Sequence, residues 1–379
     1  MKATRHPGLD WLRLAATLGV LTLHAGIAYM PHPLPGLRWA THDQTTPLAD
    51  AVCWTLDAWV MPVFFLLGGS AAAGLLAAFG SGGMARHRLR RLGGPLLLGC
   101  VLILPLDLYA WLIGDVLDGE LPLRKLRSLK LSGHDDGLWG PSHLWFLQYL
   151  LIYCLVGCGL AAWTRPSLRI RTAASRRRRR MAAAAGLFAV SAASLWIKPR
   201  ILIGFDHQPL PQPANLAFFA TFFAAGWHLP SAVWTRRQSG ATVLLGLASL
   251  LLYWPAVRST FDGTGSLVAA VGFTAACWGL GLGSLQFART IAQPLTPVAQ
   301  RMLAAAFWIY LLHHPVVGLM QVALKRTAID PNLKFAIVAV VGLCVPLATY
   351  RWLVRGRWIG RVLGEKPAVE SRPQRQAAA

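Results

Sequence analysis

WLRLAATLGVLTLHAGIAYM, residues 11–30, is an apolar stretch interrupted by two ionisable side chains, Arg13 and His24. Its length is about the 20 residues that an α-helix needs to cross the hydrocarbon layer of a membrane. Eleven steps of about 100° come within about 20° of three full turns, so Arg13 and His24 share one helix face, roughly 16 Å apart along the axis. Arg13 is therefore expected at a membrane surface and His24 deep inside the membrane. An ionisable side chain at that depth faces the protein interior and indicates a functional site.

The composition of the whole chain predicts an all-α membrane protein. Hydrophobic residues make up 55% of the 379 residues, the mean hydropathy is +0.47, and only 14% of the residues are charged. Soluble domains carry about a quarter charged residues. The apolar segments are too long for the strands of a membrane β-barrel, so they predict a polytopic helical bundle. About ten transmembrane helices are expected, at residues 11–30, 51–78, 93–114, 143–163, 181–197, 216–234, 241–257, 266–287, 303–323 and 335–353.

The net charge of +22 is unevenly distributed along the chain. Most Lys and Arg residues fall in segments that lie on one side of the predicted membrane, which is the positive-inside pattern and places both termini in the cytoplasm. The run from Arg176 to Arg180 is then a determinant of topology and of lipid-surface binding. We expect membrane lipids as partners and no nucleic acid. The predicted transmembrane domain covers residues 1–364, and residues 365–379 form a disordered basic cytoplasmic tail.

The six cysteines all lie inside predicted membrane segments. Cys154 and Cys158 are four residues apart, but no histidine or further cysteine near them in the sequence completes a set of metal ligands. These cysteines are interpreted as small packing residues, and no metal site is predicted.

Five stretches follow one another in a characteristic order and spacing. They are LDWLRLAATLGVLTLHAGIAY at 9–29, MPVFFLLGGSAAAGLL at 61–76, RHRLRRLGGPLLLG at 86–99, HLWFLQYLL at 143–151 and FWIYLLHHPVV at 307–317. Together they resemble the acyltransferase 3 family of bacterial inner-membrane enzymes, and within it the glucan succinyltransferase branch. The resemblance covers residues 9 to 355. One departure is visible, because Gly68-Gly69-Ser70 stands where the family has Ser-Gly, so this turn need not carry the family's hydroxyl group.

The resemblance implies an O-acyltransferase of the bacterial inner membrane. Such an enzyme moves an acyl group, here acetyl or succinyl, from cytoplasmic acyl-CoA to a hydroxyl group of a glycan or another envelope acceptor. Acyl-CoA is then a co-substrate, and no permanently bound cofactor is expected. Planar guanidinium groups bind phosphate through paired hydrogen bonds. The arginines expected to bind the CoA phosphates at the cytoplasmic mouth are Arg13, Arg86, Arg88, Arg90 and Arg91.

The resemblance implies that His24 is the catalytic residue. It would act as the general base that deprotonates the acceptor hydroxyl, or alternatively as the nucleophile of an acyl-histidine intermediate. A buried imidazole needs a partner that sets its tautomer. Asp107 and Asp57 lie at a similar predicted depth, and we favour Asp107; if neither carboxylate serves, a backbone carbonyl near Pro315 is the next candidate. Asp10, three residues before Arg13, is expected to orient that arginine.

His143, Trp145, His313 and His314 are the candidate substrate-binding residues. His143 and Trp145 begin a predicted span, where interfacial anchoring is the alternative interpretation. His313 and His314 are adjacent and point to different helix faces, so at most one is expected to line a cavity. A rival function is a secondary transporter or exporter of an envelope precursor, which also has a mid-membrane site. Transporters of this kind are often built from repeated halves, and the sequence shows no internal repeat.

Overall fold

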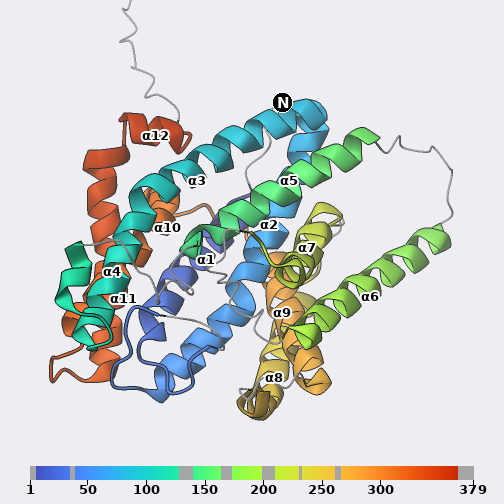
Figure 1. Ribbon diagram of the computed structural model, residues 1–379. Coiled ribbons are helices and arrows are strands. Elements are labelled where there is room, and N and C mark those ends of the chain that lie inside the picture. The colour runs from blue at the N-terminus through green and yellow to red at the C-terminus, as the bar shows by residue number, and fades with distance from the viewer. Residues whose placement is uncertain are drawn as a thin grey trace, which may run out of the picture.

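The computed structural model describes residues 6–34, 39–127, 140–163, 173–198, 210–229, 233–260 and 266–365, and these residues are helical without any strand (Figure 1). The helices are α1 (Pro7–Ile27), α2 (Pro47–Arg88), α3 (Gly94–Leu98), α4 (Leu104–Leu117), α5 (Trp145–Trp163), α6 (Ala173–Ile197), α7 (Pro213–Trp227), α8 (Arg236–Thr260), α9 (Leu267–Ala288), α10 (Pro297–Leu324), α11 (Pro331–Thr349) and α12 (Trp358–Val362). Shorter π-helical turns span Leu89–Gly93, Gly99–Ile103 and Tyr350–Val354, and 3₁₀ turns span Leu123–Arg127 and Ser142–Leu144. The all-α fold expected from the composition is confirmed.

Every membrane segment predicted from the sequence overlaps one of these helices. Six helical stretches are long and apolar enough to cross a membrane: Pro47–Leu117, Ser142–Trp163, Arg178–Ile197, Leu267–Ala288, Pro297–Leu324 and Pro331–Val354. The chain is therefore a multi-pass membrane protein. Helices α1, α7 and α8 do not belong to this set, so the number of crossings stays a prediction. The expected tail lies outside the described residues from position 366 onward.

The connection between the second and third predicted spans differs from the expectation. Residues 79–92 lie between two predicted membrane segments, but in the structure they are helical throughout, apart from a sharp reversal at Gly80. Gly80 has φ 66° and ψ −179°, a conformation that is open to glycine and closed to residues with a Cβ atom. Figure 1 shows α2 rising to this point and α3 and α4 descending from it. The basic residues 86–91 are thereby presented on a helix.

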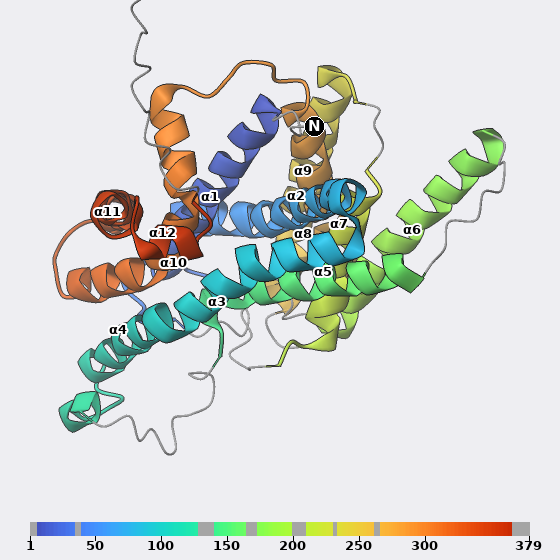
Figure 2. The same cartoon turned by 90° about the horizontal axis from the view of Figure 1, so that it is seen from above.

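Helix α10 packs against α1, α4 and α11, which makes it the common neighbour of the site-bearing elements. Figure 2 shows α10 bent into two differently directed parts. Pro315 lies inside this helix, and an internal proline bends a helix because it removes one backbone donor and its ring crowds the preceding turn.

The segment between α1 and α2 packs directly on α4. A Cβ atom added to Gly114 would lie 1.8 Å from the carbonyl oxygen of Ala40, so only glycine allows this approach. Trp39, next to Ala40, is buried. The close contact therefore carries the indole of Trp39 toward the interior of the bundle.

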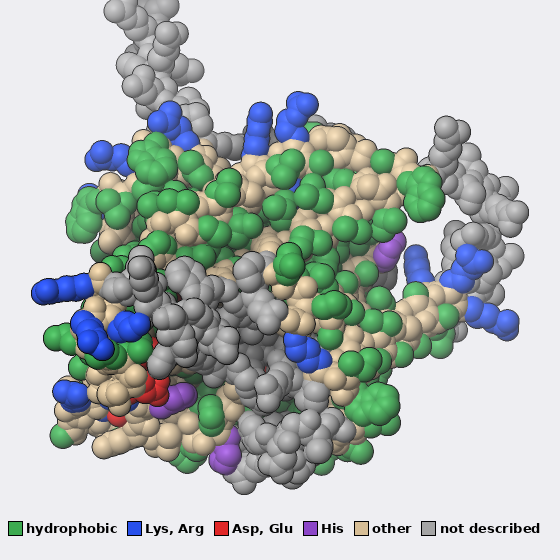
Figure 3. Space-filling view, viewed as in Figure 1, with side chains coloured by type: hydrophobic (Ala, Val, Ile, Leu, Met, Phe, Trp, Pro, Cys, Tyr) green, Lys and Arg blue, Asp and Glu red, His purple; other side chains and the backbone are tan. Residues whose placement is uncertain are grey.

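The outer surface of the helices is apolar. Figure 3 shows hydrophobic side chains over much of the visible face, with Lys and Arg projecting along its upper edge. Leu97 and Val101 near α3 and Leu251 and Leu252 on α8 are each more than two thirds exposed. An apolar surface of this extent is matched by lipid rather than by water.

The two ends of the bundle are held by different contacts. At one end, Trp11 donates to the carbonyl of Gln293, and Arg91 donates to the carbonyls of Leu363 and Gly364. At the other end, ion pairs join Lys334 to Asp43, at 2.7 Å, and Lys325 to Asp118.

Candidate active site

Four histidines and one aspartate from distant parts of the chain meet in the interior of the bundle. His24 comes from α1, Asp107 from the first turn of α4, His143 from the 3₁₀ turn before α5, and His313 and His314 from α10. All five residues are buried, with at most 4% of any one exposed. We call these five residues the central cluster.

His24 is hydrogen-bonded to His313. Nδ1 of His24 lies 2.8 Å from Nε2 of His313, and Nδ1 of His313 lies 3.0 Å and 2.8 Å from the backbone oxygens of Ile309 and Tyr310. Carbonyl oxygens only accept, so His313 donates from Nδ1 and accepts at Nε2. His24 must then donate from Nδ1, which places the lone pair of its neutral ring on Nε2. This is the nitrogen that can take a proton.

The ring and the backbone of His24 are both held in position. The rings of Trp39 and His313 stack against it, with centroid distances of 5.6 Å and 5.0 Å and interplanar angles of 20° and 18°. The Gln321 amide donates to the carbonyls of His24 and Ala25, at 3.0 Å each, and accepts from Nε1 of Trp39 at 2.7 Å. These contacts join α1, α10 and the segment that carries Trp39 around one imidazole.

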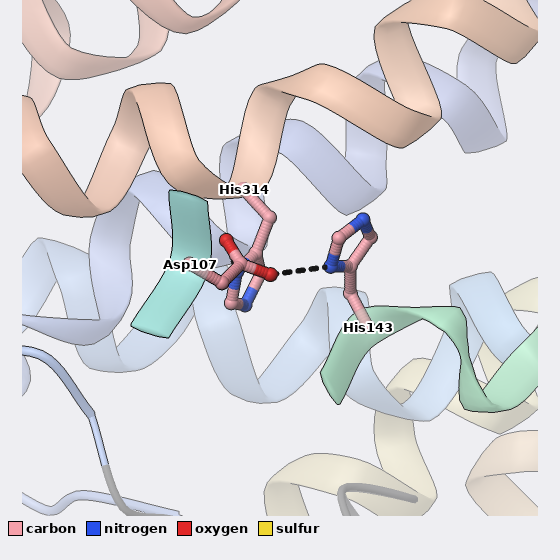
Figure 4. Close-up of side chains that lie close together, drawn as sticks. All are labelled: Asp107, His143 and His314. Atoms are coloured by element: carbon pink, nitrogen blue, oxygen red, sulfur yellow. Dashed lines mark hydrogen bonds and ion pairs between the residues drawn. The ribbon is translucent and has the colours of Figure 1, made fainter. Parts of the chain in front are cut away.

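The expected pairing of Asp107 with His24 is corrected by the structure. Asp107 Oδ1 accepts from Nδ1 of His314 at 2.9 Å, and Oδ2 accepts from the Ser142 hydroxyl at 3.2 Å. Nδ1 of His143 faces Oδ2 at 3.2 Å (Figure 4). The reason is geometric: equal depth on two helices does not give equal direction, and α10 with its two histidines lies next to both α1 and α4.

His143 uses the backbone group that Pro315 leaves open. In a regular helix the carbonyl of Leu311 would accept from the backbone N–H of residue 315, and proline has none. Nε2 of His143 lies 3.1 Å from this carbonyl oxygen and donates to it. The Tyr310 hydroxyl in turn donates to the carbonyl of His143 at 2.5 Å. A backbone carbonyl near Pro315 was expected only as a fallback partner of His24, and in the structure the Leu311 carbonyl accepts from His143 instead.

His313 and His314 both belong to the central cluster, although at most one of them was expected to line a site. Their rings are 6.1 Å apart and lie at 89° to each other. They point to different partners, one to His24 and the other to Asp107. The expectation assumed one cavity on one helix face, whereas the partners of α10 surround it on more than one side.

The predicted phosphate-binding arginines do not form one equivalent group. Arg13 is paired with Asp10 at 2.7 Å, as expected from their spacing. Arg88 is buried, and its Nε and Nη2 have no hydrogen-bond partner among the described residues. The charges of Arg13 and Arg91 both act on Arg88. A buried cation beside two like charges lacks compensation unless an anion joins it.

The remaining arginines of this group lie at the surface. Arg86 and Arg90 are exposed. Arg91 is also exposed, and its guanidinium is bound to the carbonyls of Leu363 and Gly364 just after α12. Arg91 therefore joins the π-helical turn Leu89–Gly93 to the residues that follow α12.

Two other predicted site residues lie elsewhere in the interior. Asp57 is buried on α2, and its Oδ2 has no hydrogen-bond partner among the described residues. Trp145 is buried in an aromatic group, with its ring 5.0 Å from that of Phe219 and 5.1 Å from that of Tyr149. The Trp145 ring packs inside this aromatic group, and its substrate-binding role stays a prediction.

Sequence reasoning missed Ser142, Trp39 and Gln321. Gln321 carried a usable signal, because an uncharged amide follows His314 by seven residues, about two turns, in an otherwise apolar segment. Ser142 precedes His143 directly, and Gly140-Pro141 before it signals a turn, but the sequence does not show that the Ser142 hydroxyl reaches Asp107. Trp39 lies in a connecting segment whose path is set only by packing.

The fold and the site define a multi-pass membrane protein with a buried, histidine-rich centre. The acyltransferase 3 family model, described as an acyltransferase domain, matches residues 6–351. The chain belongs to this family and is a membrane acyltransferase. Neither a curated protein nor a solved structure matched the chain.

Proposed function

We propose that this acyltransferase moves an acetyl or succinyl group from cytoplasmic acyl-CoA to a hydroxyl group of an envelope glycan, at the inner membrane of a bacterium. Acyl-CoA is a co-substrate that leaves after each turnover. The observation that carries the proposal is the orientation of His24, whose basic nitrogen is set by a hydrogen bond to His313. The motifs resemble those of the glucan succinyltransferase branch, and we propose succinyl or acetyl transfer on that ground.

The arginines support an anionic donor that enters at the N-terminal end of α1. Arg13 and His24 lie on the same continuous helix, eleven residues and roughly 16 Å apart. Arg88 is buried close to Arg13 and lacks hydrogen bonds to the described residues through two of its nitrogens. A phosphate group of CoA would compensate this charge, and its flexible arm would extend along α1 toward His24.

The chemistry at His24 is a direct transfer. Nε2 of His24 takes the proton from the acceptor hydroxyl while the hydroxyl oxygen attacks the thioester carbonyl carbon. The tetrahedral intermediate then releases CoA as a thiolate, which receives the proton from His24, and the acyl group remains on the acceptor as an ester. His313 stabilises the transient imidazolium, because it accepts from Nδ1 of His24 in both protonation states.

An acyl-histidine intermediate is the alternative route. Labelling of the protein in the absence of an acceptor separates the two routes. In direct transfer, purified protein mixed with radiolabelled acyl-CoA and no acceptor gives no labelled protein. An acyl-enzyme would give up to one labelled acyl group per chain, which alkali or hydroxylamine removes.

The test of the proposal uses purified full-length protein in lipid vesicles, supplied with radiolabelled acetyl-CoA or succinyl-CoA and a glucan acceptor. We expect labelled glucan that depends on both the donor and His24. An absence of transfer from either donor, with folded protein and CoA binding intact, would overturn the assignment of donor and acceptor.

A further inference from the structure

The structure assigns a divalent metal site to Asp107, His143 and His314, and we propose Zn²⁺ as its ion. One ligand atom from each residue lies within 4.8 Å of the others, and all three residues are buried. Two imidazoles and one carboxylate form a ligand set typical of Zn²⁺ and related first-row metals. No metal site was predicted from the sequence, because these ligands are spread over three separate segments.

The distances suit a metal after a small adjustment. Oδ1 of Asp107 lies 2.9 Å from Nδ1 of His314, and Oδ2 of Asp107 lies 3.2 Å from Nδ1 of His143 (Figure 4). In a tetrahedral Zn²⁺ site with bonds of about 2.0–2.1 Å, neighbouring ligand atoms are about 3.3 Å apart. Each imidazole nitrogen is therefore close to ligand spacing from one oxygen of the carboxylate, and the three ligand atoms all lie within 4.8 Å of one another.

The orientation of His143 is the strongest argument. Its Nε2 donates to the Leu311 carbonyl, so Nε2 carries the hydrogen and Nδ1 of the neutral ring carries a lone pair. This buried Nδ1 lies 3.2 Å from Oδ2 of Asp107, which also presents lone pairs, and it has no other partner among the described residues. Two facing lone pairs repel unless a cation lies between them. A metal ion or a proton are the two possible occupants.

The surrounding groups favour the metal. Metal-binding histidines usually donate their second N–H to a backbone carbonyl or carboxylate, which fixes the ring. His143 does this with Leu311, and the Ser142 hydroxyl donates to Oδ2 of Asp107 as an outer partner of the carboxylate. His314 donates from Nδ1 to Asp107 in this structure. To bind metal through Nδ1, its neutral ring moves that hydrogen to Nε2 without a change in charge.

The site would add a positive charge next to the proposed base. The ring centroid of His314 is 5.0 Å from that of His24. Zn²⁺ with one carboxylate leaves a net charge of about +1, and three protein ligands leave the fourth position of a tetrahedral ion for solvent or substrate. That position would suit an oxygen that gains negative charge during acyl transfer.

The experiment measures metal in the purified full-length protein. After incubation with Zn²⁺ and removal of excess ion, we expect close to one bound Zn²⁺ per chain by elemental analysis. Asp107→Asn, His143→Gln and His314→Gln should each lower metal affinity by more than the roughly 10–100-fold that loss of an outer partner costs. His32→Gln is the matched control, because His32 and Asp50 form a histidine–carboxylate pair away from the cluster, at 2.6 Å, and it should retain the metal.

A second measurement does not depend on variants that fold. X-ray absorption at the zinc edge of the wild-type protein should show nitrogen and oxygen ligands at about 2.0–2.1 Å, with imidazole scattering and no sulfur. Wild-type protein that binds no more Zn²⁺ than Asp107→Asn would overturn the proposal and leave a proton between His143 and Asp107. Sulfur ligands would also overturn it. Neither result depends on acyl transfer, which the His24 assay tests separately.

Discussion

Backbone carbonyls of α10 set the tautomer of His24, and they act through the imidazole of His313. His313 donates to carbonyl oxygens of its own helix and thereby presents Nε2 as an acceptor to His24. A backbone carbonyl cannot be protonated near neutral pH or removed by substitution. The expected carboxylate is therefore not needed to orient the base, and Asp107 is available for His314 and His143.

Replacing His24 with alanine should abolish most of the acyl transfer. A general base contributes typically about 10²–10⁴-fold to rate, so we expect a loss of this size in kcat while CoA binding is retained. Radiolabel transfer and equilibrium binding of CoA measure the two quantities. His32→Ala serves as the control for a histidine outside the central cluster. Near-normal turnover by His24→Ala at equal expression would rule out the assigned role.

His313 is a positioning residue, and its replacement should act through His24. His313→Ala should lower kcat by roughly 10-fold or more with little change in the KM for acyl-CoA, because the lost contact orients the base. His313→Gln keeps an acceptor oxygen and should recover part of the rate. In the double variant with His24→Ala, the second change should add almost nothing, since the two residues act as a unit. Additive losses would separate their functions.

At the scale of single elements, α2 reverses direction at Gly80, in a conformation that only glycine adopts. The helical turns that follow carry the basic residues. The chain is helical again after the reversal at Gly80, so the arginines that follow are spaced by helical geometry. This explains why Arg88 is buried while its neighbours Arg86 and Arg90 are exposed. One guanidinium of the group enters the protein, and the others lie at the surface.

Arg88→Gln should raise the KM for acyl-CoA at least tenfold while kcat changes little, because a phosphate contact acts equally before and during chemistry. Arg86→Gln, two residues earlier on the same helix and exposed, is the matched control and should behave as wild type. Initial rates over a range of acyl-CoA concentrations measure both constants. Equal losses in kcat and kcat/KM for Arg88→Gln would place this arginine at the reacting atoms.

Pro315 has a chemical consequence in addition to the bend of α10. Pro315→Ala would restore a backbone N–H that competes with His143 for the Leu311 carbonyl. An internal proline costs a helix about 3 kcal/mol, so propensity alone predicts a more stable protein. We nevertheless expect acyl transfer to fall by roughly 10-fold, because His143 would be released from the Leu311 carbonyl. Thermal unfolding and turnover measure the two effects, and a variant that is both more stable and fully active would limit the proline to a bending role.

At the scale of the whole molecule, the two ends of the bundle differ in charge pairing. Lys334 and Lys325 at one end are paired with aspartates, whereas two nitrogens of Arg88 at the opposite end have no hydrogen-bond partner among the described residues. Lipid headgroups on the cytoplasmic face attract unpaired basic side chains. We therefore propose that the arginine-rich end faces the cytoplasm.

A labelling experiment tests this orientation. Arg237→Cys and Arg124→Cys introduce thiols at exposed positions near opposite ends, in a background without the exposed Cys100 and Cys344. In intact spheroplasts, a membrane-impermeant maleimide should label the thiol at 124 and should reach the thiol at 237 only after lysis. The reverse pattern would invert the proposed topology, and with it the side from which acyl-CoA enters.

The fold class was predictable, because apolar segments of membrane length allow few alternatives to a helical bundle. The cluster's members were also predictable one by one, since an ionisable residue deep in an apolar segment is expensive and conspicuous. Their pairing was not. Asp107 and His24 lie at similar depths, but direction depends on the bend at Pro315 and on how α10 packs, and both are tertiary properties. Ser142 and Trp39 lie outside regular helices and gave no periodic signal.

The distances along the chain between partners set an order of events during synthesis. Asp107 is made 207 residues before His314, and His24 is made 289 residues before His313. At a translation rate of about 5–20 residues per second, these gaps last roughly 10–60 s. During this time Asp107 and His24 lack the hydrogen-bond partners that α10 provides, whether they are already in the bilayer or still held outside it. A nascent chain of this protein should therefore depend on the insertion machinery until α10 emerges, and a chain truncated before α10 should be a substrate for membrane proteolysis.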